Sequence, residues 1–144
     1  MKKFAFSLGR VMEFRRIQAR VEEIKLENLY AELRAIDARE AALVHQSALG
    51  ENALREQQSV SGFDLELFGT HREAIKKERK RMDKARAECR GRIDAQLAVL
   101  AAKRRDVKLI ERLKEQRFTK WEQEMLKEID RQAEEAYLAK WNRE

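Results

Sequence analysis

The stretch Ser59-Val60-Ser61-Gly62-Phe63-Asp64 separates two long runs of a 144-residue sequence that contains no proline and only five glycines. Serine and glycine are typical of turns, and the spacing of Ser61 and Asp64 predicts a capping box that begins a helix. Val60 can staple that helix by packing on Leu65. The stretch therefore predicts the point at which one long helix ends and another begins.

A second helix-start signal follows this turn. Thr70 and Glu73 stand at cap spacing directly after Gly69, so residues 63–68 are expected to form a short helical turn of their own. We therefore predict a hairpin tip at about residues 59–69.

The sequence before the tip predicts one helix over about residues 8–58, interrupted only by Gly50. Its apolar residues recur at steps of three and four: Phe14, Ile17, Val21, Ile24, then Leu26, Leu29, Leu33, Ile36 and Leu43. The change between the Ile24 and Leu26 series does not fit a single heptad phase. We therefore expect the apolar seam to drift around the helix or to contain a stutter.

The sequence after the tip predicts a second helix over about residues 70–142. Its apolar stripe comprises Ile75, Met82, Cys89, Ile93, Leu100, Val107 and Ile110, then Phe118, Trp121, Met125, Ile129, Ala136 and Trp141. With 40% charged residues, the chain can bury a seam rather than a large core. The prediction is an all-α single domain over residues 1–144, a long antiparallel two-helix coiled-coil hairpin.

The distribution of charge supports antiparallel pairing. Residues 26–66 are net acidic and residues 72–92 are net basic, within a chain of net charge +6. A hairpin places these two segments side by side, which favours the antiparallel arrangement over the parallel one.

The unequal helix lengths predict an overhang at the C-terminal end of the second helix. Because Leu8 would pair near residue 115, the helix beyond about Phe118 would extend roughly 35 to 40 Å past its partner. This overhang contains Phe118, Trp121, Met125, Ile129, Tyr137 and Trp141. We interpret it as a docking surface; the alternatives are that the N-terminal segment extends alongside it or that two chains dimerise there.

The single cysteine and the hydropathy pattern point to a cytoplasmic protein in a reducing compartment. Cys89 lies in register with Met82 and Ile93, which favours a buried seam residue over a reactive thiol. Arg10 cuts the first apolar run short of a signal peptide, and the run at 97–102 is far below the ~20 residues of a membrane span.

Residue patterns for catalysis, cofactors and metals are missing. His45 and His71 have no ligands or nucleophile at suitable spacing, so we expect no enzyme, no cofactor and no metal site. The basic run over residues 76–81, with Lys84 and Arg86, raises the possibility of nucleic-acid binding. Its interleaved acids and lack of aromatics favour a solvated, partly paired face or an acidic protein partner, and no specific nucleic acid is expected.

The chain opens with Phe4-x-Phe6-x-Leu8-x-x-Val11-Met12 and the pair Arg15-Arg16, has its tip near residue 60, and carries Glu111-Arg112-Leu113-Lys114-Glu115 ahead of a charged tail. In these features the chain resembles the FliJ family of flagellar type III export. The resemblance implies a stalk protein, cytoplasmic and peripheral to the inner face of the cell membrane. Such a stalk binds the hexameric export ATPase, promotes its assembly and activity, and links it to the membrane export gate, with export chaperones as further partners.

The resemblance also implies two sets of partner-binding residues. The ATPase ring would contact Phe14, Arg15, Arg16, Ile17, Val21, Val107, Ile110, Leu113, Arg117 and Trp121, and the export gate would contact Leu65, Leu67, Phe68 and Ala74. Two other functions stay open: a structural coiled-coil adaptor or export chaperone that uses the C-terminal aromatic stripe, and the equivalent stalk of a virulence secretion system.

Overall fold

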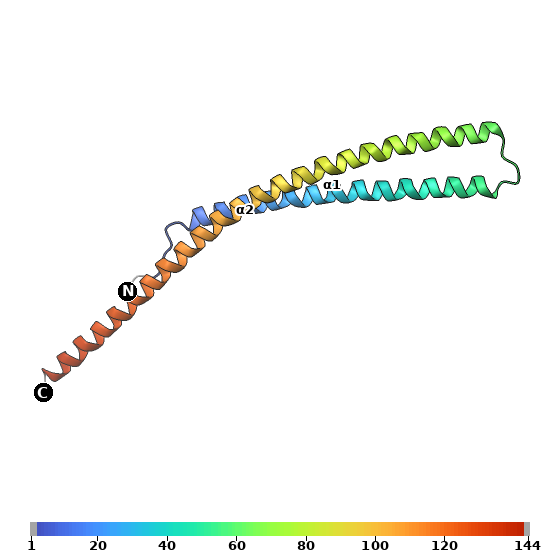
Figure 1. The fold of residues 1–144 in the computed structure, drawn as a ribbon. Coiled ribbons are helices and arrows are strands. Elements are labelled where there is room, and N and C mark those ends of the chain that lie inside the picture. The colour runs from blue at the N-terminus through green and yellow to red at the C-terminus, as the bar shows by residue number, and fades with distance from the viewer. Residues whose placement is uncertain (1–2, 143–144) are drawn as a thin grey trace. The chain divides into compact units, whose positions relative to one another are not determined.

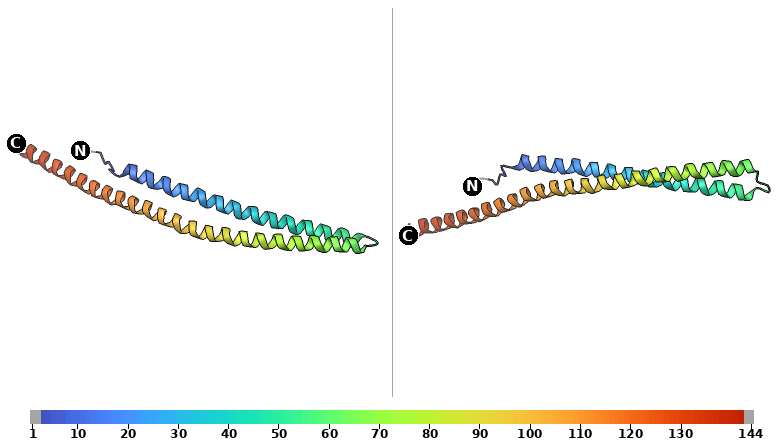
Figure 2. Two further views of the ribbon diagram at one scale, coloured as in Figure 1. Left: turned by 90° about the horizontal axis from the view of Figure 1, so that it is seen from above. Right: turned by 45° about the horizontal axis from the view of Figure 1, so that its top comes forward.

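The protein consists of two long helices that pack together (Figures 1 and 2). This computed structural model describes residues 3–142, and no strand is found among them. Helix α1 spans Gly9–Glu56, with 48 residues, and α2 spans Gly62–Trp141, with 80 residues. The all-helical class predicted from the sequence is confirmed. Neither described helix contains a stretch with the length and hydropathy that a membrane span requires.

The connection between the helices is shorter than predicted. It comprises residues 57–61, because α2 begins at Gly62 and not near residue 70. The predicted capping box is present: Asp64 N–H donates to Ser61 Oγ (3.1 Å), and Ser61 N–H donates to Asp64 Oδ2 (3.2 Å). The second predicted start is wrong, since Thr70 Oγ1 donates to the Glu66 carbonyl (3.0 Å) inside a continuous helix. A hydroxyl bonded to the carbonyl four residues back belongs to a helix interior.

The helices divide into two compact units. One unit comprises Met1–Val21 with Leu100–Glu144, and the other comprises Glu22–Val99. The division has a physical reason, since a residue on one long helix meets only the few residues beside it on the other. No central core therefore draws the whole length together, and each unit is described separately below.

The Glu22–Val99 unit has a narrow apolar seam. Its buried hydrophobic residues are Leu26, Ile75, Met82, Cys89 and Ile93. Cys89 is fully buried, and its thiol lies 3.4 Å from the Leu29 carbonyl, to which it donates a hydrogen bond. The prediction that Cys89 is a seam residue is confirmed, because a side chain with no exposed surface is closed to reagents in the folded state.

Ion pairs flank this seam and join the acidic stretch of α1 to the basic start of α2. Arg86 Nε donates to Asp37 Oδ1 (2.9 Å), and the same guanidinium also bonds Glu40. Arg92 pairs with Glu32 at 2.5 Å. These hydrogen bonds raise the pKa of Arg86 and of Arg92 above the ordinary arginine value, Glu40 being the largest cause for the first and Glu32 for the second. The bands of opposite charge seen in the sequence thus meet in space.

The buried face of α1 keeps one heptad phase, so the predicted drift or stutter is wrong. Buried and half-buried residues follow steps of four and three: Met12, Arg15, Ala19, Glu22, Leu26, Leu29, Leu33, Ile36, Glu40 and Leu43. Polar residues at Arg15 and Glu22 interrupt the apolar pattern of this face and hide its phase. The series Phe14, Ile17, Val21 and Ile24 belongs to a different face of α1, and those four side chains are 43–60% exposed.

Candidate partner-binding surfaces

Residues 3–8 form an N-terminal arm that precedes α1 and packs on α2. Exposure alternates along the arm: Phe4, Phe6 and Leu8 are half-buried, whereas residues 3, 5 and 7 are exposed. Alternation with a period of two is typical of an extended segment with one face against a surface. The Phe-x-Phe-x-Leu opening therefore has a structural role within the Met1–Val21 and Leu100–Glu144 unit.

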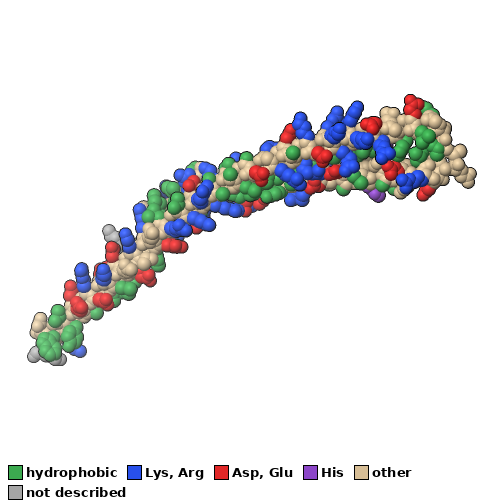
Figure 3. All heavy atoms as spheres, viewed as in Figure 1, with side chains coloured by type: hydrophobic (Ala, Val, Ile, Leu, Met, Phe, Trp, Pro, Cys, Tyr) green, Lys and Arg blue, Asp and Glu red, His purple; other side chains and the backbone are tan. Residues whose placement is uncertain are grey.

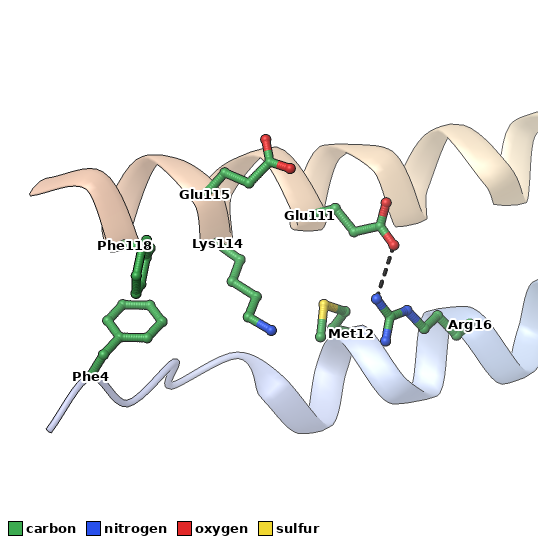
Figure 4. A pocket seen from close by; sticks show the side chains of 7 residues that line it. All are labelled: Phe4, Met12, Arg16, Glu111, Lys114, Glu115 and Phe118. Carbon is green, nitrogen blue, oxygen red and sulfur yellow. Dashed lines mark hydrogen bonds and ion pairs between the residues drawn. The ribbon is translucent and has the colours of Figure 1, made fainter. Parts of the chain in front are cut away.

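The aromatic rings of the arm and of α2 form a cluster. The Phe4 ring lies 5.2 Å from the Phe118 ring at an interplanar angle of 86°, and 5.8 Å from the Trp121 ring. Phe118 and Trp121 are themselves 5.7 Å apart. Edge-on and tilted contacts at these distances are favourable aromatic geometries. Figure 4 shows Phe4 reaching from the arm to Phe118 on α2.

Arg117 makes a second set of contacts with the arm. Its guanidinium lies 5.7 Å from the centroid of the Phe6 ring, within the range of a cation–π interaction. Its Nη1 also donates a hydrogen bond to Ser7 Oγ (2.9 Å). One α2 side chain thus engages two successive arm residues, one by its ring and the other by its hydroxyl.

These contacts correct the predicted overhang. Phe118 and Trp121 do have an intramolecular partner, since the N-terminal arm extends alongside them, as one of the sequence alternatives held. Further along α2 only Met125 is half-buried. Several large apolar residues of this section are exposed, namely Leu126, Ile129, Tyr137, Leu138 and Trp141. Figure 3 shows hydrophobic side chains at the surface toward this end of α2.

A groove of about 450 Å³ lies between the arm, the start of α1 and α2. Phe4, Met12 and Phe118 give it an apolar lining, and Arg16, Glu111, Lys114 and Glu115 complete it (Figure 4). Arg16 Nη2 donates to Glu111 Oε1 (3.0 Å) across the two helices. In the same view Lys114 extends toward Met12, whereas Glu115 points away from the groove. The groove combines an apolar wall with an inward-facing cation, which suits an apolar group that carries negative charge nearby.

The residues expected at the ATPase ring fall into three groups. Phe14, Ile17 and Val21 are 57%, 60% and 45% exposed on α1, opposite the face that carries Met12 and Ala19. We call these three residues the α1 stripe. On α2, Val107, Ile110 and Leu113 are half-buried. The structure therefore does not pair the two apolar sets with each other.

The basic members of the ring set make contacts within this unit. Arg15 Nη1 lies 3.8 Å from Asp106 Oδ2, and Arg16 bonds Glu111 as described above. Arg117 and Trp121 hold the arm. Sequence reasoning held contact with the N-terminal segment only as an alternative and did not name the residues that make it, although the alternating Phe4-x-Phe6-x-Leu8 pattern contained the signal for them.

The residues expected at the export gate lie in the first turns of α2, in the Glu22–Val99 unit. Leu65 is 56% exposed and Leu67 is 60% exposed, and Ala74 is also exposed. Phe68 is half-buried. Three of the four side chains are therefore open at the surface of their unit.

The basic run is partly neutralised by carboxylates. Lys76 pairs with Glu73 (3.3 Å), Arg81 with Glu78 (3.5 Å) and Arg79 with Glu40 of α1 (3.6 Å). Figure 3 shows Lys and Arg side chains interspersed with Asp and Glu over this region. The arrangement matches the solvated, partly paired face weighed for this segment.

Side chains that could catalyse a reaction or bind a metal do not gather at these surfaces, as far as the described residues show. His45 and His71 are both exposed. Within the part of the chain that the structure describes, His, Cys, Asp and Glu side chains gather in no group of three or more that could hold a metal ion. Comparison of the chain with protein-family models, with curated proteins and with solved structures finds no match.

Proposed function

We propose that the protein is a non-enzymatic stalk of the flagellar protein export apparatus, built as an antiparallel coiled-coil hairpin with an overhanging C-terminal helix. The order of the cross-helix contacts supports the antiparallel arrangement. Ser7 and Arg16 meet Arg117 and Glu111 in one unit, and Glu32 and Asp37 meet Arg92 and Arg86 in the other. In both units the α2 number falls as the α1 number rises.

The α1 stripe carries the proposal. Three large apolar side chains stand exposed at regular spacing on the face of α1 opposite its seam, where a solvated helix normally carries polar residues. The packing of the chain itself does not require them there. A partner that surrounds this part of the molecule would cover them, and a hexameric ATPase ring is such a partner. Arg15 and Arg16, expected at acidic loops of the ring, pair with Asp106 and Glu111 inside the unit and would have to exchange these partners to bind it.

Binding of this kind explains how a protein without catalytic groups would raise the activity of an enzyme. A stalk that contacts an assembled ring gains more contacts than one that meets a separate subunit, so by mass action it favours the assembled state. Hydrolysis remains the chemistry of the ring. A rod that touches six subunits unequally would also couple turnover to the export gate.

The other partner assignments fit the structure to different degrees. Exposed Leu65, Leu67 and Ala74 are available for the gate protein, whereas half-buried Phe68 would act as support. Val107, Ile110 and Leu113 are half-buried, so only their exposed parts would be open to the ring. Arg117 and Trp121 become available to the ring only if the arm leaves. This function places the protein in the cytoplasm, at the inner face of the membrane, with export chaperones as further partners.

The test is reconstitution with the cognate export ATPase. The native chain should increase the hexamer fraction in size-exclusion chromatography and the rate of ATP hydrolysis. A Phe14→Ser, Ile17→Ser, Val21→Ser variant should lose both effects. Leu126→Ser, Ile129→Ser, Leu138→Ser is the matched control, because these side chains are 55%, 43% and 59% exposed on α2 of the same unit and lie further along α2 than the residues beside the stripe. A stripe variant that stimulates hydrolysis as well as the control does would refute the proposal.

A second candidate function rests on the exposed C-terminal section of α2. Ile129, Tyr137 and Trp141 would let a coiled-coil adaptor or export chaperone hold amphipathic helices of client proteins. Truncation after Met125 separates the two functions while leaving the arm contacts in place. An adaptor should lose client binding, whereas a stalk should still stimulate the ATPase. The stalk of a virulence secretion system would behave like the flagellar one with a different ATPase.

A further inference from the structure

The N-terminal arm occupies α2 in the manner of a bound peptide. Among the described residues, the backbone hydrogen bonds found outside the helices include none between the arm and α2. The described arm contacts are instead made by the side chains of Phe4, Phe6 and Ser7 on Phe118, Trp121 and Arg117. The arm's own backbone bonds lie in the turn into α1, where Gly9 N–H donates to the Phe6 carbonyl (3.1 Å) and Met12 N–H to the Leu8 carbonyl (2.9 Å). A segment held on α2 by side chains alone can leave α2 and be replaced there while α2 stays intact.

The arm also leaves part of its site unfilled. The groove of about 450 Å³ beside Phe4 is lined by Met12 and Phe118, and the arm's own residues do not occupy it. A segment with a larger or longer apolar side chain at the Phe4 position would bury more of this wall. Because the gain from burial grows with the apolar area removed from water, such a segment would compete with the arm.

The positive charges beside the arm indicate that a competing segment would carry a negative charge. Arg117 donates to a neutral hydroxyl, Ser7 Oγ, at 2.9 Å. A carboxylate in the place of this hydroxyl would form a charge-assisted hydrogen bond, which is stronger than the neutral one. Lys114 extends into the adjoining groove and adds a second positive charge (Figure 4).

We propose that the α2 face formed by Arg117, Phe118 and Trp121 is a binding site for an extended segment of another protein. That segment carries bulky aromatic residues at alternate positions followed by an acidic residue, and the chain's own arm is the resident occupant. A second copy of this chain is the weaker occupant, since its arm carries the same Ser7 and gains no ion pair. Arg117 and Trp121 also belong to the residues expected at the ring, but the stalk proposal is carried by the α1 stripe, whereas this inference is carried by the arm contacts and does not depend on that proposal.

Two labelled peptides and a vacated site provide the test. The full chain with Phe4→Ala and Phe6→Ala empties the site, and circular dichroism checks that its helices persist. Fluorescence anisotropy then measures the binding of a peptide of residues 3–8 and of the same peptide with Ser7→Asp. At low salt the acidic peptide should bind with a Kd about two- to fivefold lower, the range expected for one exposed ion pair. Arg117→Gln should remove the difference.

Matched tryptophan variants locate the binding. In the Phe4→Ala, Phe6→Ala chain, a further Trp121→Ala substitution should raise the Kd of the acidic peptide at least fivefold. Trp141→Ala, at a residue 68% exposed, should leave that Kd unchanged. Equal losses at both tryptophans, equal affinity for the two peptides, or no binding at millimolar peptide would each overturn the proposal. So would a native dimer in sedimentation that disappears when the arm is vacated, because it would identify a second copy as the occupant.

Discussion

The rings of Phe4 and Phe118 meet edge-on at a centroid distance of 5.2 Å, although residues 4 and 118 lie more than 100 positions apart in the sequence. This contact anchors the arm to α2 and covers part of two neighbouring aromatic rings, leaving Phe118 43% exposed and Trp121 half-buried. It also explains why the sequence places phenylalanines two residues apart before α1 begins at Gly9. The arm is thus a folded part of its unit and not a tail.

Loss of the Phe4 ring should release the arm locally without unfolding the helices. In a Trp141→Phe background, Phe4→Ala should shift the Trp121 emission toward the red and speed amide exchange in the arm. The loss of aromatic contacts amounts to about 0.5–1.5 kcal/mol per ring pair. Phe63→Ala is the control, because Phe63 is 72% exposed and lies in the other unit. An unchanged Trp121 spectrum in the Phe4 variant would contradict the arm contact.

The seam assignment predicts opposite outcomes for two residues of α1 that look alike in the sequence. Leu26 is 8% exposed and Ile17 is 60% exposed. Leu26→Ala should lower the free energy of unfolding by about 2–4 kcal/mol, because it leaves a cavity in the seam. Ile17→Ala should change it by no more than about 0.5 kcal/mol, as for an ordinary surface substitution. Urea unfolding followed by circular dichroism measures the free energy of unfolding of both variants. Similar losses in the two would favour the predicted seam that drifts around α1.

Much of the fold was predictable because its signals are local. The Ser61 and Asp64 capping box, the buried series from Ile75 to Leu100, and the opposite charges of α1 and the start of α2 all follow from residue spacing or composition. Each involves residues that are close along one helix, or charges summed over long segments. Periodicity and composition are well suited to detecting such features.

The errors arose where one pattern had two meanings. Phe14, Ile17 and Val21 have the spacing of a seam but lie on the opposite face, since an amphipathic spacing does not say which of two stripes faces the partner helix. Polar Arg15 and Glu22 in the true seam made the wrong choice more attractive. The contact of the arm with Phe118 depends on distant residues, and no local pattern fixes which face of α2 it meets.

The start of α2 predicts unequal effects for its two cap-like residues. Ser61→Ala removes the acceptor for the Asp64 N–H, and it should cost about 0.5–2 kcal/mol of stability. Thr70→Ala removes only a hydroxyl bonded back to the Glu66 carbonyl in a continuous helix, and it should be neutral or slightly stabilising. Thermal unfolding of the two variants compares them directly. A larger loss at Thr70 would place a helix start near residue 70 after all.

Arg86 predicts a stabilising contribution that persists at alkaline pH. Its hydrogen bonds to Glu40 and Asp37 raise its pKa in the folded state, so in the range where both carboxylates are ionised the contribution is fully present below the ordinary arginine value and is lost only as pH rises beyond it. Arg86→Gln should therefore lower Tm by a similar amount at pH 7 and pH 10. Arg81→Gln, at a side chain 79% exposed, should lower Tm less. A deficit that vanishes between pH 7 and pH 10 would show that another group is responsible.

Cys89 should report on the opening of the Glu22–Val99 unit. Its side chain is fully buried and its thiol is bonded to the Leu29 carbonyl, so a thiol reagent can reach it only when the helices separate locally. In the native chain its reaction with Ellman's reagent should be slower by a factor on the order of 100 than that of an exposed cysteine. Ala53→Cys in a Cys89→Ala background supplies that reference, because Ala53 is exposed on α1 of the same unit. Urea below the unfolding midpoint should accelerate the reaction of Cys89 and leave the reference rate nearly constant. Equal rates for the two thiols in the absence of urea would mean that the seam is open around Cys89. That result would contradict the burial of Leu26, Met82 and Ile93 in the same seam.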